Sequence, residues 1–573
     1  SIDGGVNWQK QNEGYLDAVY NSYGYYFGRI HVSPTNPEQI YIYGVPILKS
    51  NDSGSTFKRI GASNVHVDHH DLWINPKDTN HLVLGNDGGV NISYDQGENW
   101  IKLNQPSVGQ FYSINVDNSE PYNVYGGLQD NGVWMAKNNS IESPAWHESG
   151  HNNWTKILGG DGMQIQIDNR NNNIVYTGLQ FGNYYRLNLT NESRKNIKPK
   201  HKFGDSPLRF NWQTPILLSP HNQDILYLGS NKLHRSFDKG DNWQEISGDL
   251  TNGGIKGNVP YGTITSFDES VFQFGKIIVG SDDGKISITE NSGDSWKLLS
   301  KDLPKNLWVS RVIFSKQRKN RIYVSLNGYR FNDFTPYLYV SDDNGSSWTN
   351  ISSNLPLSPI NVIKEDINKE EILYVGTDNG AFISLDFGKK WHPFTNSLNR
   401  VAVHDIVIHK ESNELLLGTH GRSIYKTNLK IFTDYLNNKV PDNKITIVNI
   451  DDLTYRNSWG SISNRDQSVS LIYDKPQLDP RSFIQVDLFS ELSDNFQYKI
   501  LNNDKRLLSS GKIKLDKGFN RLQILPVAEP SLNQKQRKKL GLTLKKADDG
   551  NVYFNKGKYI FYINNASKEF LVK

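Results

Sequence analysis

Short apolar runs alternate with polar turns along most of this chain. Residues 309–314 (VSRVIF), 320–325 (NRIYVS), 337–340 (YLYV) and 348–351 (WTNI) each have the length and composition of a β-strand, and turn-forming residues separate them. Four short strands in succession, joined by tight turns, predict a four-stranded antiparallel sheet of the kind that forms one blade of a β-propeller.

The same pattern recurs, which makes a repeat architecture the first expectation. We find nine units, at roughly residues 25–60, 66–103, 109–137, 157–190, 210–248, 260–300, 307–353, 359–395 and 401–428. The ninth unit supplies about three strands, so a strand from elsewhere is expected to complete it. The fold class predicted is all-β. Either a seven-bladed ring follows the last blades of another ring, or one ring has nine to ten blades.

A short motif marks most units. Residues 341–348 (SDDNGSSW) read S-x-D-x-G-x-x-W, and variants begin at residues 1, 50, 93, 236, 289 and 384. Asp and Ser side chains bond to the backbone of their own turn, and Gly supplies a positive φ. We interpret the motif as an Asp-box, a hairpin corner with its Trp folded back as an apolar plug. Its acidic or amide position is therefore structural: Asp3, Asp52, Asp95, Asp238, Asn291, Asp343 and Asp386.

The pattern changes after residue 428. Residues 429–465 predict a polar linker, and residues 466–573 alternate again, at 468–473, 484–488, 496–501, 521–524 and 559–563. We expect a β-sandwich of immunoglobulin-like type there. The predicted domains are thus residues 1–108 (the last blades of an N-terminal propeller, or the first blades of a single large ring), 109–428 (a seven-unit propeller), the linker, and the sandwich.

Composition narrows the function. The chain has 573 residues with a net charge of +4, too small to favour nucleic acid as a partner. It has no cysteine, which excludes disulfides and thiolate chemistry, and no apolar run long enough for a transmembrane segment. No signal peptide or initiator Met is present, and the chain starts inside an Asp-box. We expect it to be a piece of a longer protein.

Blade geometry predicts where a ligand binds. The Asp-boxes join strands three and four of each blade, so they lie on one face of the propeller. The opposite face carries the turns between strands two and three and the links between blades, and pockets in propellers open around the central channel. Polar side chains on that face are candidate ligand-binding residues: His66, His70, Gln129, Arg311, His404, His420 and Arg422.

The densest polar group is residues 66–71 (HVDHHD). Three imidazoles and two carboxylates suit a divalent metal, general acid–base chemistry or structural hydrogen bonding. Alternation along a strand places only His66, Asp68 and His70 on one side, so these three are weak metal candidates and no cofactor is expected. A glycosidase needs two facing carboxylates. The catalytic candidates are Asp68, Asp87, Asp130 and Asp161.

Several longer phrases resemble a known family. Residues 66–73 (HVDHHDLW), 84–90 (LGNDGGV), 121–132 (PYNVYGGLQDNG) and 418–423 (GTHGRS) are similar to large bacterial Asp-box (BNR-repeat) propeller proteins of the sortilin N-terminal-domain or "glycosyl hydrolase" type. The resemblance implies a propeller and little chemistry, because a fold does not confer a reaction. The C-terminal residues 557–573 also resemble the end of a type IX secretion sorting domain, and an ordinary accessory sandwich is the alternative. The resemblance implies a Bacteroidota-like protein that is secreted or on the outer membrane surface.

Three functions remain. The first is an extracytoplasmic sortilin-like scaffold, not an enzyme, that binds a peptide, protein or glycan at the channel mouth. The second is a glycoside hydrolase that acts on a polysaccharide through a carboxylate pair. The third is an accessory subunit of a cell-envelope complex.

Overall fold

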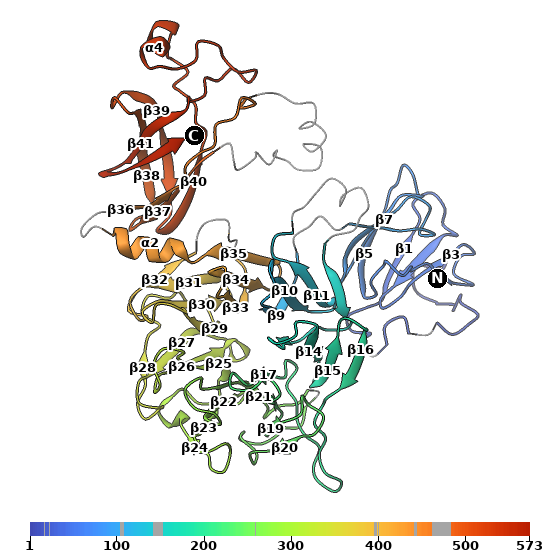
Figure 1. Cartoon of the computed structure of the whole chain (residues 1–573). Helices are drawn as coiled ribbons and strands as arrows, with labels where there is room; N and C mark the ends of the chain where they lie inside the picture. Colours follow the sequence, from blue (N-terminus) through green and yellow to red (C-terminus); the bar gives the residue numbers. More distant parts are fainter. Residues whose placement is uncertain are drawn as a thin grey trace. The chain divides into compact units, whose positions relative to one another are not determined.

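The fold is built almost entirely from strands, which confirms the all-β prediction. The structure, a computed structural model, describes residues 1–16, 18–21, 23–103, 108–140, 153–257, 259–394, 398, 400–439, 444–460 and 483–573. Contacts divide the chain into two units (Figure 1). The first unit is Ser1–Val108 with Ser119–Met163, and the second is Gly109–Asn118 with Gln164–Lys573. Residues 119–163, which the sequence assigns to the second propeller, therefore group with the first unit.

The first unit contains antiparallel sheets whose strands follow the chain order. They are β1 (Arg29–Val32), β2 (Ile40–Tyr43), β3 (Ile47–Ser50) and β4 (Lys58–Arg59); then β5 (His69–Ile74), β6 (Leu82–Asn86), β7 (Gly89–Ser93) and β8 (Ile101–Leu103); then β10 (Asn123–Leu128), β11 (Gly132–Lys137) and β12 (Thr155–Leu158).

The second unit begins with β9 (Phe111–Val116) and continues with further sheets of the same antiparallel kind. They are β13 (Gln166–Ile167), β14 (Ile174–Leu179), β15 (Asn183–Asn188) and β16 (Ser193–Asn196); β17 (Ile216–Leu218), β18 (Leu226–Gly229), β19 (Leu233–Ser236) and β20 (Gln244–Glu245); β21 (Ile264–Glu269), β22 (Ile277–Ser281), β23 (Ile286–Thr289) and β24 (Lys297–Leu298); β25 (Trp308–Phe314), β26 (Ile322–Gly328), β27 (Asp333–Ser341) and β28 (Thr349–Asn350); β29 (Ile360–Glu365), β30 (Leu373–Thr377), β31 (Gly380–Ser384) and β32 (Trp391–Pro393); and β33 (Val403–His409), β34 (Glu414–Thr419) and β35 (Ile424–Asn428). The 3₁₀ turns η1 (Ser300–Asp302) and η2 (Tyr329–Phe331) lie between strands.

The first strands of the second unit lie around a common axis. Contacts run in order from β9 to β13, β17, the sheet of β21, then β25, β29 and β33, and β33 returns to β9. Figure 1 shows β17, β21, β25, β29 and β33 inside and β16, β20, β24 and β28 outside. The closed cycle fits a ring of seven, the first of the two predicted ring sizes.

Side chains accept hydrogen bonds from the backbone N–H groups at the inner edges of several first strands. An unpaired strand edge presents free N–H groups, which must find acceptors when they are buried. Ser266 Oγ accepts from Val312 N at 3.1 Å, and Asp268 Oδ2 accepts from Phe314 N at 2.9 Å, so β21 holds β25. In the same way Asp405 Oδ2, on β33, accepts from Ile114 N, on β9, at 3.1 Å. These bonds link consecutive sheets around the axis.

The S-x-D-x-G-x-x-W motifs that precede β4, β8, β20, β24, β28 and β32 join the third strand of a sheet to the fourth. In residues 341–348, Ser341 Oγ accepts from Gly345 N at 2.7 Å, and Asp343 Oδ1 accepts from Ser347 N at 2.9 Å. Bonds of the same kind occur in the other copies. These aspartates therefore hold their own turns closed.

The Trp of most motifs contacts the preceding sheet. Trp391 is 1% exposed, and its Nε1 donates to Ile351 O at 2.8 Å. Trp100, Trp243, Trp296 and Trp348 bond in the same way to the residue at the end of the sheet before. Gly345 also packs closely against Leu299: a Cβ atom on Gly345 would lie only 2.5 Å from Leu299 Cδ1. The motif is thus a staple between neighbouring sheets as well as a turn.

The C-terminal part of the second unit is a two-sheet sandwich. One sheet has the order β36 (Ile445–Ile450), β37 (Ile484–Ser490), β40 (Gly518–Ile524). The other has β39 (Leu507–Leu515), β38 (Asp494–Asn502), β41 (Gly557–Ile563), β42 (Ala566–Val572). Their inward faces form one apolar core, with Leu488, Ile500 and Phe561 fully buried. The short helix α4 (Gln534–Lys539) follows β40.

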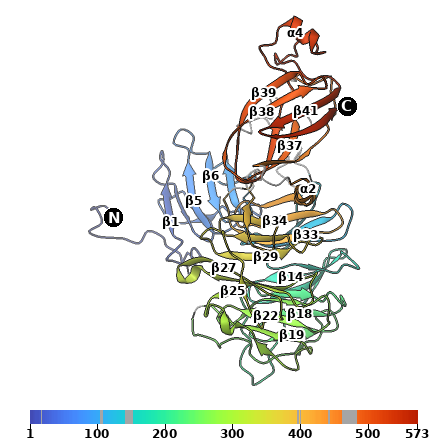
Figure 2. The same cartoon turned by 90° about the vertical axis from the view of Figure 1, so that its left-hand side faces the viewer.

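The linker prediction for residues 429–465 is wrong in its described part, which contains a helix and a strand. Helix α2 (Lys430–Asn438) buries Phe432 and Tyr435 among side chains of the ring and of the sandwich. Figure 2 shows α2 between the ring strand β34 and the sandwich strand β37. Strand β36 pairs with β37. The polar residues that predicted a linker occupy the exposed side of α2. The predicted strand at 468–473 lies outside the described residues.

Candidate functional site

The candidate residues fall into two groups, one in each unit. His66, Asp68, His70, Asp87, Gln129, Asp130 and Asp161 belong to the first unit, and Arg311, His404, His420 and Arg422 belong to the second. Each group is described by itself.

In the first unit, His66 and Asp161 bind the turn that contains Asp130. His66 Nε2 lies 2.9 Å from Asp130 O, and His66 Nδ1 lies 2.7 Å from Val67 O. Asp161 Oδ1 accepts from Asp130 N at 2.8 Å. Asp130 itself has a φ of 60°, and Asp68 a φ of 64°, a left-handed conformation that Asp tolerates better than most residues. His66 and Asp161 thus support backbone, while the Asp130 carboxylate stays outside these bonds.

His70 and Asp87 form a close pair. His70 Nε2 lies 2.6 Å from Asp87 Oδ1, and the His70 ring packs against Tyr26 and Phe27 with centroid distances of 5.3 and 5.7 Å. Asn131 Nδ2 donates to Asp87 O at 2.9 Å. An imidazole oriented by a carboxylate is a general-base arrangement in enzymes and also a common structural pair.

Electrostatics distinguish this group from the motif turns. Burial, then the charges of Asp161 and Asp87, raises the pKa of Asp130 to about 6. Burial and Asp87 raise the pKa of Asp68, and burial raises that of Asp161 although the Asp130 N–H opposes it. Carboxylates that crowd each other in a partly dry site hold a proton more readily. Asp130 therefore holds a proton more readily than an ordinary aspartate does.

The weak metal candidates His66, Asp68 and His70 do not form a ligand set. Both ring nitrogens of His66 face carbonyl oxygens, and His70 pairs with Asp87. In the part of the chain that the structure describes, no three His, Asp or Glu side chains are grouped to hold a metal ion. Strand alternation predicted that the three side chains point to the same side. Asp68, however, has a left-handed conformation that breaks the extended backbone, and β5 begins only after it, at His69.

In the second unit, four aromatic or imidazole side chains lie at the end of the propeller ring where the first strand of each sheet begins. His404 and His420 stack at a centroid distance of 4.5 Å, and Tyr112 stacks on His420 at 5.4 Å. Trp212 Nε1 donates to Tyr112 Oη at 3.3 Å, and the Trp212 side chain is 37% exposed. We call Tyr112, Trp212, His404 and His420 the ring mouth.

The two imidazoles of the ring mouth are neutral near pH 7. Burial, then the nearby His420 and Arg311, lowers the pKa of His404 to about 3. Burial also lowers the pKa of His420, whose Nδ1 has no hydrogen-bond partner among the described residues. A neutral imidazole offers one donor and one acceptor, so the ring mouth presents flat polar surfaces rather than charge.

Arg311 lies beside the ring mouth and reaches past the neighbouring strand β29 to β33. It belongs to β25, yet its Nη2 lies 3.3 Å from Asp405 Oδ1 and 3.4 Å from His404 O, both on β33. Strand β29 stands between β25 and β33 in the cycle. The guanidinium therefore projects into the ring interior. The Asp405 carboxylate also accepts from Ser113 Oγ at 2.8 Å, so it is fully engaged.

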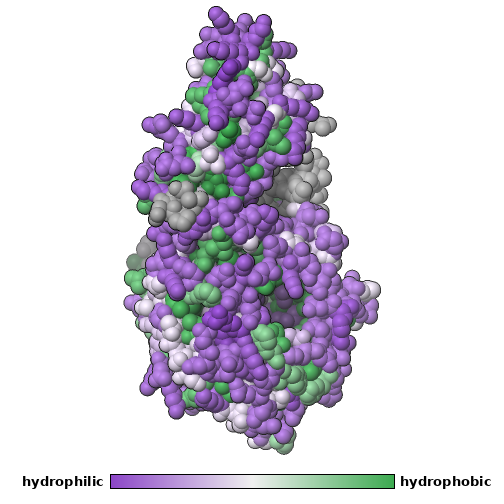
Figure 3. Space-filling model, turned by 60° about the vertical axis from the view of Figure 1, so that its left-hand side comes forward, coloured by the Kyte–Doolittle hydropathy of each residue, from purple (hydrophilic) through white to green (hydrophobic). Residues whose placement is uncertain are grey.

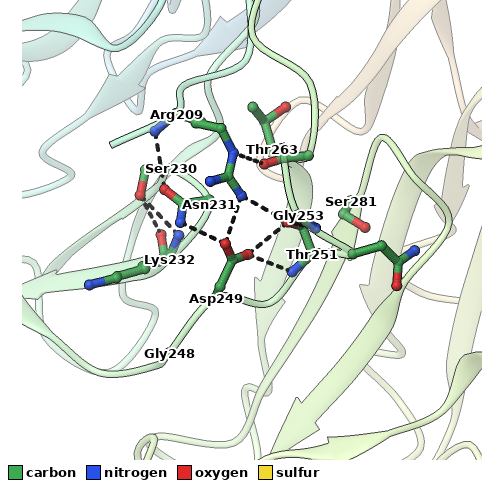
Figure 4. A network of polar contacts seen from close by, with 12 residues as sticks. Arg209, Ser230, Asn231, Lys232, Gly248, Asp249, Thr251, Gly253, Thr263 and Ser281 are labelled. Carbon is green, nitrogen blue, oxygen red and sulfur yellow. Dashed lines mark hydrogen bonds and ion pairs between the residues drawn. The ribbon is translucent and has the colours of Figure 1, made fainter. Parts of the chain in front are cut away.

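Arg209, another cation on this face, is structural (Figure 4). Its Nη2 donates to Asp249 Oδ2 at 2.7 Å and to Thr251 Oγ1 at 3.1 Å, and its Nε donates to Gly262 O at 3.0 Å. Asn231 Nδ2 also donates to Asp249 Oδ2 at 3.1 Å. The network ties the loop before β17 to the loop before β21.

The remaining candidates lie apart from these contacts. Gln129 contributes its main-chain oxygen, which accepts from Asn131 N at 2.7 Å, and the Arg422 side chain is exposed. Sequence reasoning missed Lys364, on the inner strand β29. The signal was weak: one lysine in residues 360–365 (INVIKE), where Asn361 and Glu365 are polar too.

A separate cavity of about 200 Å³ lies beside β35 and α2. Leu415, Leu417, Phe432 and Phe519 line it, and its charged residues Asp487 and Arg521 bond to each other. It adjoins the sandwich strand β40 as well as the ring strands β34 and β35. The face drawn in Figure 3 is mostly hydrophilic, with apolar residues in separate patches.

The fold and the ring mouth define the class: an all-β protein with a propeller ring and a C-terminal sandwich. No helix among the described residues is long and apolar enough to cross a membrane. No protein-family model and no curated protein matches the chain.

Solved structures with distant similarity exist. PorZ, an essential surface component of the type-IX secretion system of Porphyromonas gingivalis, is 11% identical over 95% of this chain and 70% of its own, with a TM-score of 0.43. The extracellular domain of a putative hybrid two-component system from B. thetaiotaomicron is 10% identical over 95% and 67%, with a TM-score of 0.42. A GH74 enzyme of Niastella koreensis is 12% identical over 80% and 81%, with a TM-score of 0.25. Similarity at this level carries no argument about function.

Proposed function

We propose that this protein is an extracytoplasmic binding scaffold that holds a peptide, protein or glycan at the ring mouth without chemical conversion. The observation that carries the proposal is the continuous row of rings from Trp212 through Tyr112 and His420 to His404. Trp212 is exposed and Tyr112, His404 and His420 are half-buried. Aromatic and neutral imidazole faces stack on flat or apolar ligand groups, and their polar edges give hydrogen bonds. The location outside the cytoplasm is the one that the sequence resemblance implies.

The carboxylates near the ring mouth favour binding over hydrolysis. Hydrolysis needs two carboxylates roughly 5–10 Å apart that are free to act on a substrate. Asp405 accepts from Ser113, Ile114 and Arg311, and Asp378 accepts from Asn361 Nδ2 at 2.8 Å. Asp405 is thus committed to protein donors, whereas Asp378 is exposed and supplies one carboxylate of the pair that hydrolysis needs, so the ring mouth favours recognition over acid–base chemistry.

The test is binding to a peptide library and a polysaccharide array by the intact chain and by Trp212→Ala and His420→Ala. We expect both variants to lose at least about tenfold in affinity, as central aromatic contacts do. Phe237→Ala, an exposed aromatic residue in a motif turn at the opposite end of its sheet, is the matched control. Equal binding by all four proteins would place the ligand elsewhere.

The second candidate is a glycoside hydrolase, supported by the raised pKa of Asp130, about 6 through burial and its acidic neighbours. Asp130 would protonate the leaving group, and one of Asp68, Asp87 and Asp161 would act as the partner carboxylate. Release of reducing ends from a polysaccharide panel, abolished in Asp130→Asn, would establish it. Absence of products in every digest would leave binding as the function.

A further inference from the structure

The last sheet of the ring, β33–β35, has three strands, whereas the preceding sheets β25–β28 and β29–β32 have four. Among the described residues no strand pairs with the outer edge of β35, and the chain continues into α2. Every residue of β35 is partly or fully exposed, whereas β31, the third strand of the sheet before, is buried except for one residue. An open strand edge is a template for a further strand.

In the sheet before, a motif tryptophan fills an apolar space. Trp391 is 1% exposed and packs in one cluster with Ile351, Leu355, Leu373 and Val375. The first two of these follow the last strand of the preceding sheet, and the other two belong to β30. Two further motif tryptophans have the same surroundings. The equivalent residues are Ile246, Leu250, Ile277 and Val279 around Trp296, and Leu299, Leu303, Ile322 and Val324 around Trp348.

Backbone pairing identifies the equivalent positions beside the last sheet. Phe394 N donates to Ala381 O, on the third strand of its sheet, at 2.9 Å, and Ile351 N makes the same bond one sheet earlier, at 2.9 Å. Phe394 therefore has the place of Ile351. Leu398 follows Phe394 at the same spacing as Leu355 follows Ile351, so it has the place of Leu355.

The second strand of the last sheet provides the other half of the space. Leu415 pairs with Thr427, as Leu373 pairs with Ser384 one sheet earlier. Leu417 lies two positions further along β34, on the same side of the sheet as Leu415. The two leucines therefore have the places of the two β30 residues around the motif tryptophan.

A cavity of about 200 Å³ lies at this place. Phe394, Leu398, Leu415 and Leu417 line it, and Phe432, from α2, forms another part of its wall. An apolar cavity of about 150 Å³ takes up benzene in another protein, so this cavity has room for an aromatic ring. The residues that follow β35 contain no motif and no tryptophan. The cavity is thus a tryptophan site of the ring for which the last sheet supplies no tryptophan.

We propose that the cavity and the edge of β35 bind an extended segment of a partner protein that carries a tryptophan. The backbone of the segment pairs with β35 as a fourth strand, and its indole fills the cavity. By equivalence the indole N–H donates to Phe394 O, as Trp391 Nε1 donates to Ile351 O at 2.8 Å. Strand addition gains affinity from backbone bonds and specificity from side-chain pockets. No ring-mouth residue lines the cavity, so the inference does not depend on the ligand of the ring mouth.

The chemistry of the site favours an apolar group on a polypeptide. The charged side chains at the cavity are paired, Arg521 with Asp487 at 2.7 Å and Lys426 with Glu414 at 3.1 Å, so the site does not select an ion. A free aromatic molecule would fill the cavity and leave the edge of β35 unpaired, whereas a strand with a tryptophan occupies both.

The experiment measures the binding of two synthetic peptides. One has residues 341–353 of this chain, a motif with the strand that follows it, and the other carries Trp348→Ala. The proteins are the intact chain, Leu398→Trp and Ile431→Trp, which fill the cavity from two of its walls, and the control Leu357→Trp. Leu357 is 78% exposed, so the control adds a tryptophan at the surface. The readouts are the fluorescence anisotropy of labelled peptide, competition by free indole, and hydrogen exchange of the β35 amides.

We expect the tryptophan peptide to bind the intact chain and Leu357→Trp equally and to slow hydrogen exchange in β35. Both cavity-filling variants should bind it at least about tenfold more weakly, and the alanine peptide should bind the intact chain more weakly by a similar factor, because the indole is the anchor. If neither cavity-filling variant folds, the two peptides on the intact chain and the exchange of the β35 amides decide the outcome.

Equal binding of the two peptides, or equal binding by all folded variants, would overturn the site. Binding without protection of the β35 amides would overturn the strand pairing. Binding of free indole without binding of either peptide would assign the cavity to a small aromatic molecule instead. A dimer of the intact chain in sedimentation that Leu398→Trp dissociates would place the segment on a second copy and overturn the assignment to a partner protein.

Discussion

Aspartates at the two ends of the same sheets have opposite properties. In the β5–β8 sheet, Asp95 lies in the motif turn between β7 and β8, where the N–H and side chain of Asn99 and the Ser93 hydroxyl lower its pKa. At the other end, before β5, burial and Asp87 raise the pKa of Asp68. The difference is one of donors: the motif turn surrounds its carboxylate with N–H and O–H groups, and the other end crowds carboxylates together. The motif end therefore stabilises the fold, and the strand-start end is where we propose that ligands bind.

The largest expected effect is a difference in stability between two Trp→Ala variants, one at each end of the sheets. Trp391→Ala, in a motif, should lower the free energy of unfolding by about 3–5 kcal/mol, since it removes a fully buried ring and its bond to Ile351 O. Trp212→Ala, at the ring mouth, should lower it less, by about 1–2 kcal/mol, because that ring is 37% exposed. Denaturant unfolding of both variants measures this. Similar losses would mean that the ring mouth is a structural core.

A smaller effect concerns a hydroxyl inside a motif turn. Ser236 is 1% exposed, and its Oγ accepts from Gly240 N at 2.8 Å while it donates to Asp238 Oδ1 at 2.7 Å. Ser236→Ala leaves a buried N–H without an acceptor and should cost about 1–3 kcal/mol. Ser346→Ala, an exposed serine in another copy, is the control and should be neutral. A neutral Ser236→Ala would show that the turn does not need its hydroxyl.

The smallest expected effect is the change in stability with pH that an aspartate causes. Its sign differs between the two ends of the sheets. The folded pKa of Asp130 is about 6, above the ordinary 3.8, so the folded state binds more protons than the unfolded state between these values. Its contribution to stability is therefore lost as pH rises through this window. Asp130→Asn should be more stable than the parent at pH 7, by about 1 kcal/mol after allowance for partial exposure, and equal to it below pH 4.

Asp238 is the matched comparison. Its pKa is lowered to about 2 by the Asn242 side chain and N–H and by Ser236, so its stabilising contribution is present above pH 3.8 and is lost as pH falls toward 2. Asp238→Asn should thus be less stable than the parent at pH 7. Unfolding temperatures of both variants between pH 3 and 7 check the pair. The same sign for both would refute the contrast between the two ends.

Much of the fold follows from local sequence. The alternation of apolar and polar residues predicted strands in every one of the nine ranges, because a strand with one buried face needs a period of two. The motif predicted its own turn because Ser341, Asp343 and Gly345 interact with one another within eight residues of the chain. A local pattern cannot show where a turn side chain ends up, and Trp348 bonds to Leu299 O of the preceding sheet rather than to its own turn.

The sequence by itself determined the strands, the turns and the end of the blades at which polar side chains collect, since these depend on neighbours along the chain. Only the tertiary structure decided which candidates remain available. His66 and Asp161 looked equivalent to the other polar candidates, yet both are engaged by the turn that contains Asp130. Arg311, on β25, reaches Asp405 and His404 on β33 because ring closure brings β25, β29 and β33 together around one axis. Contacts between residues dozens of positions apart have no signature in a local pattern, so burial and pairing emerge only when the chain closes.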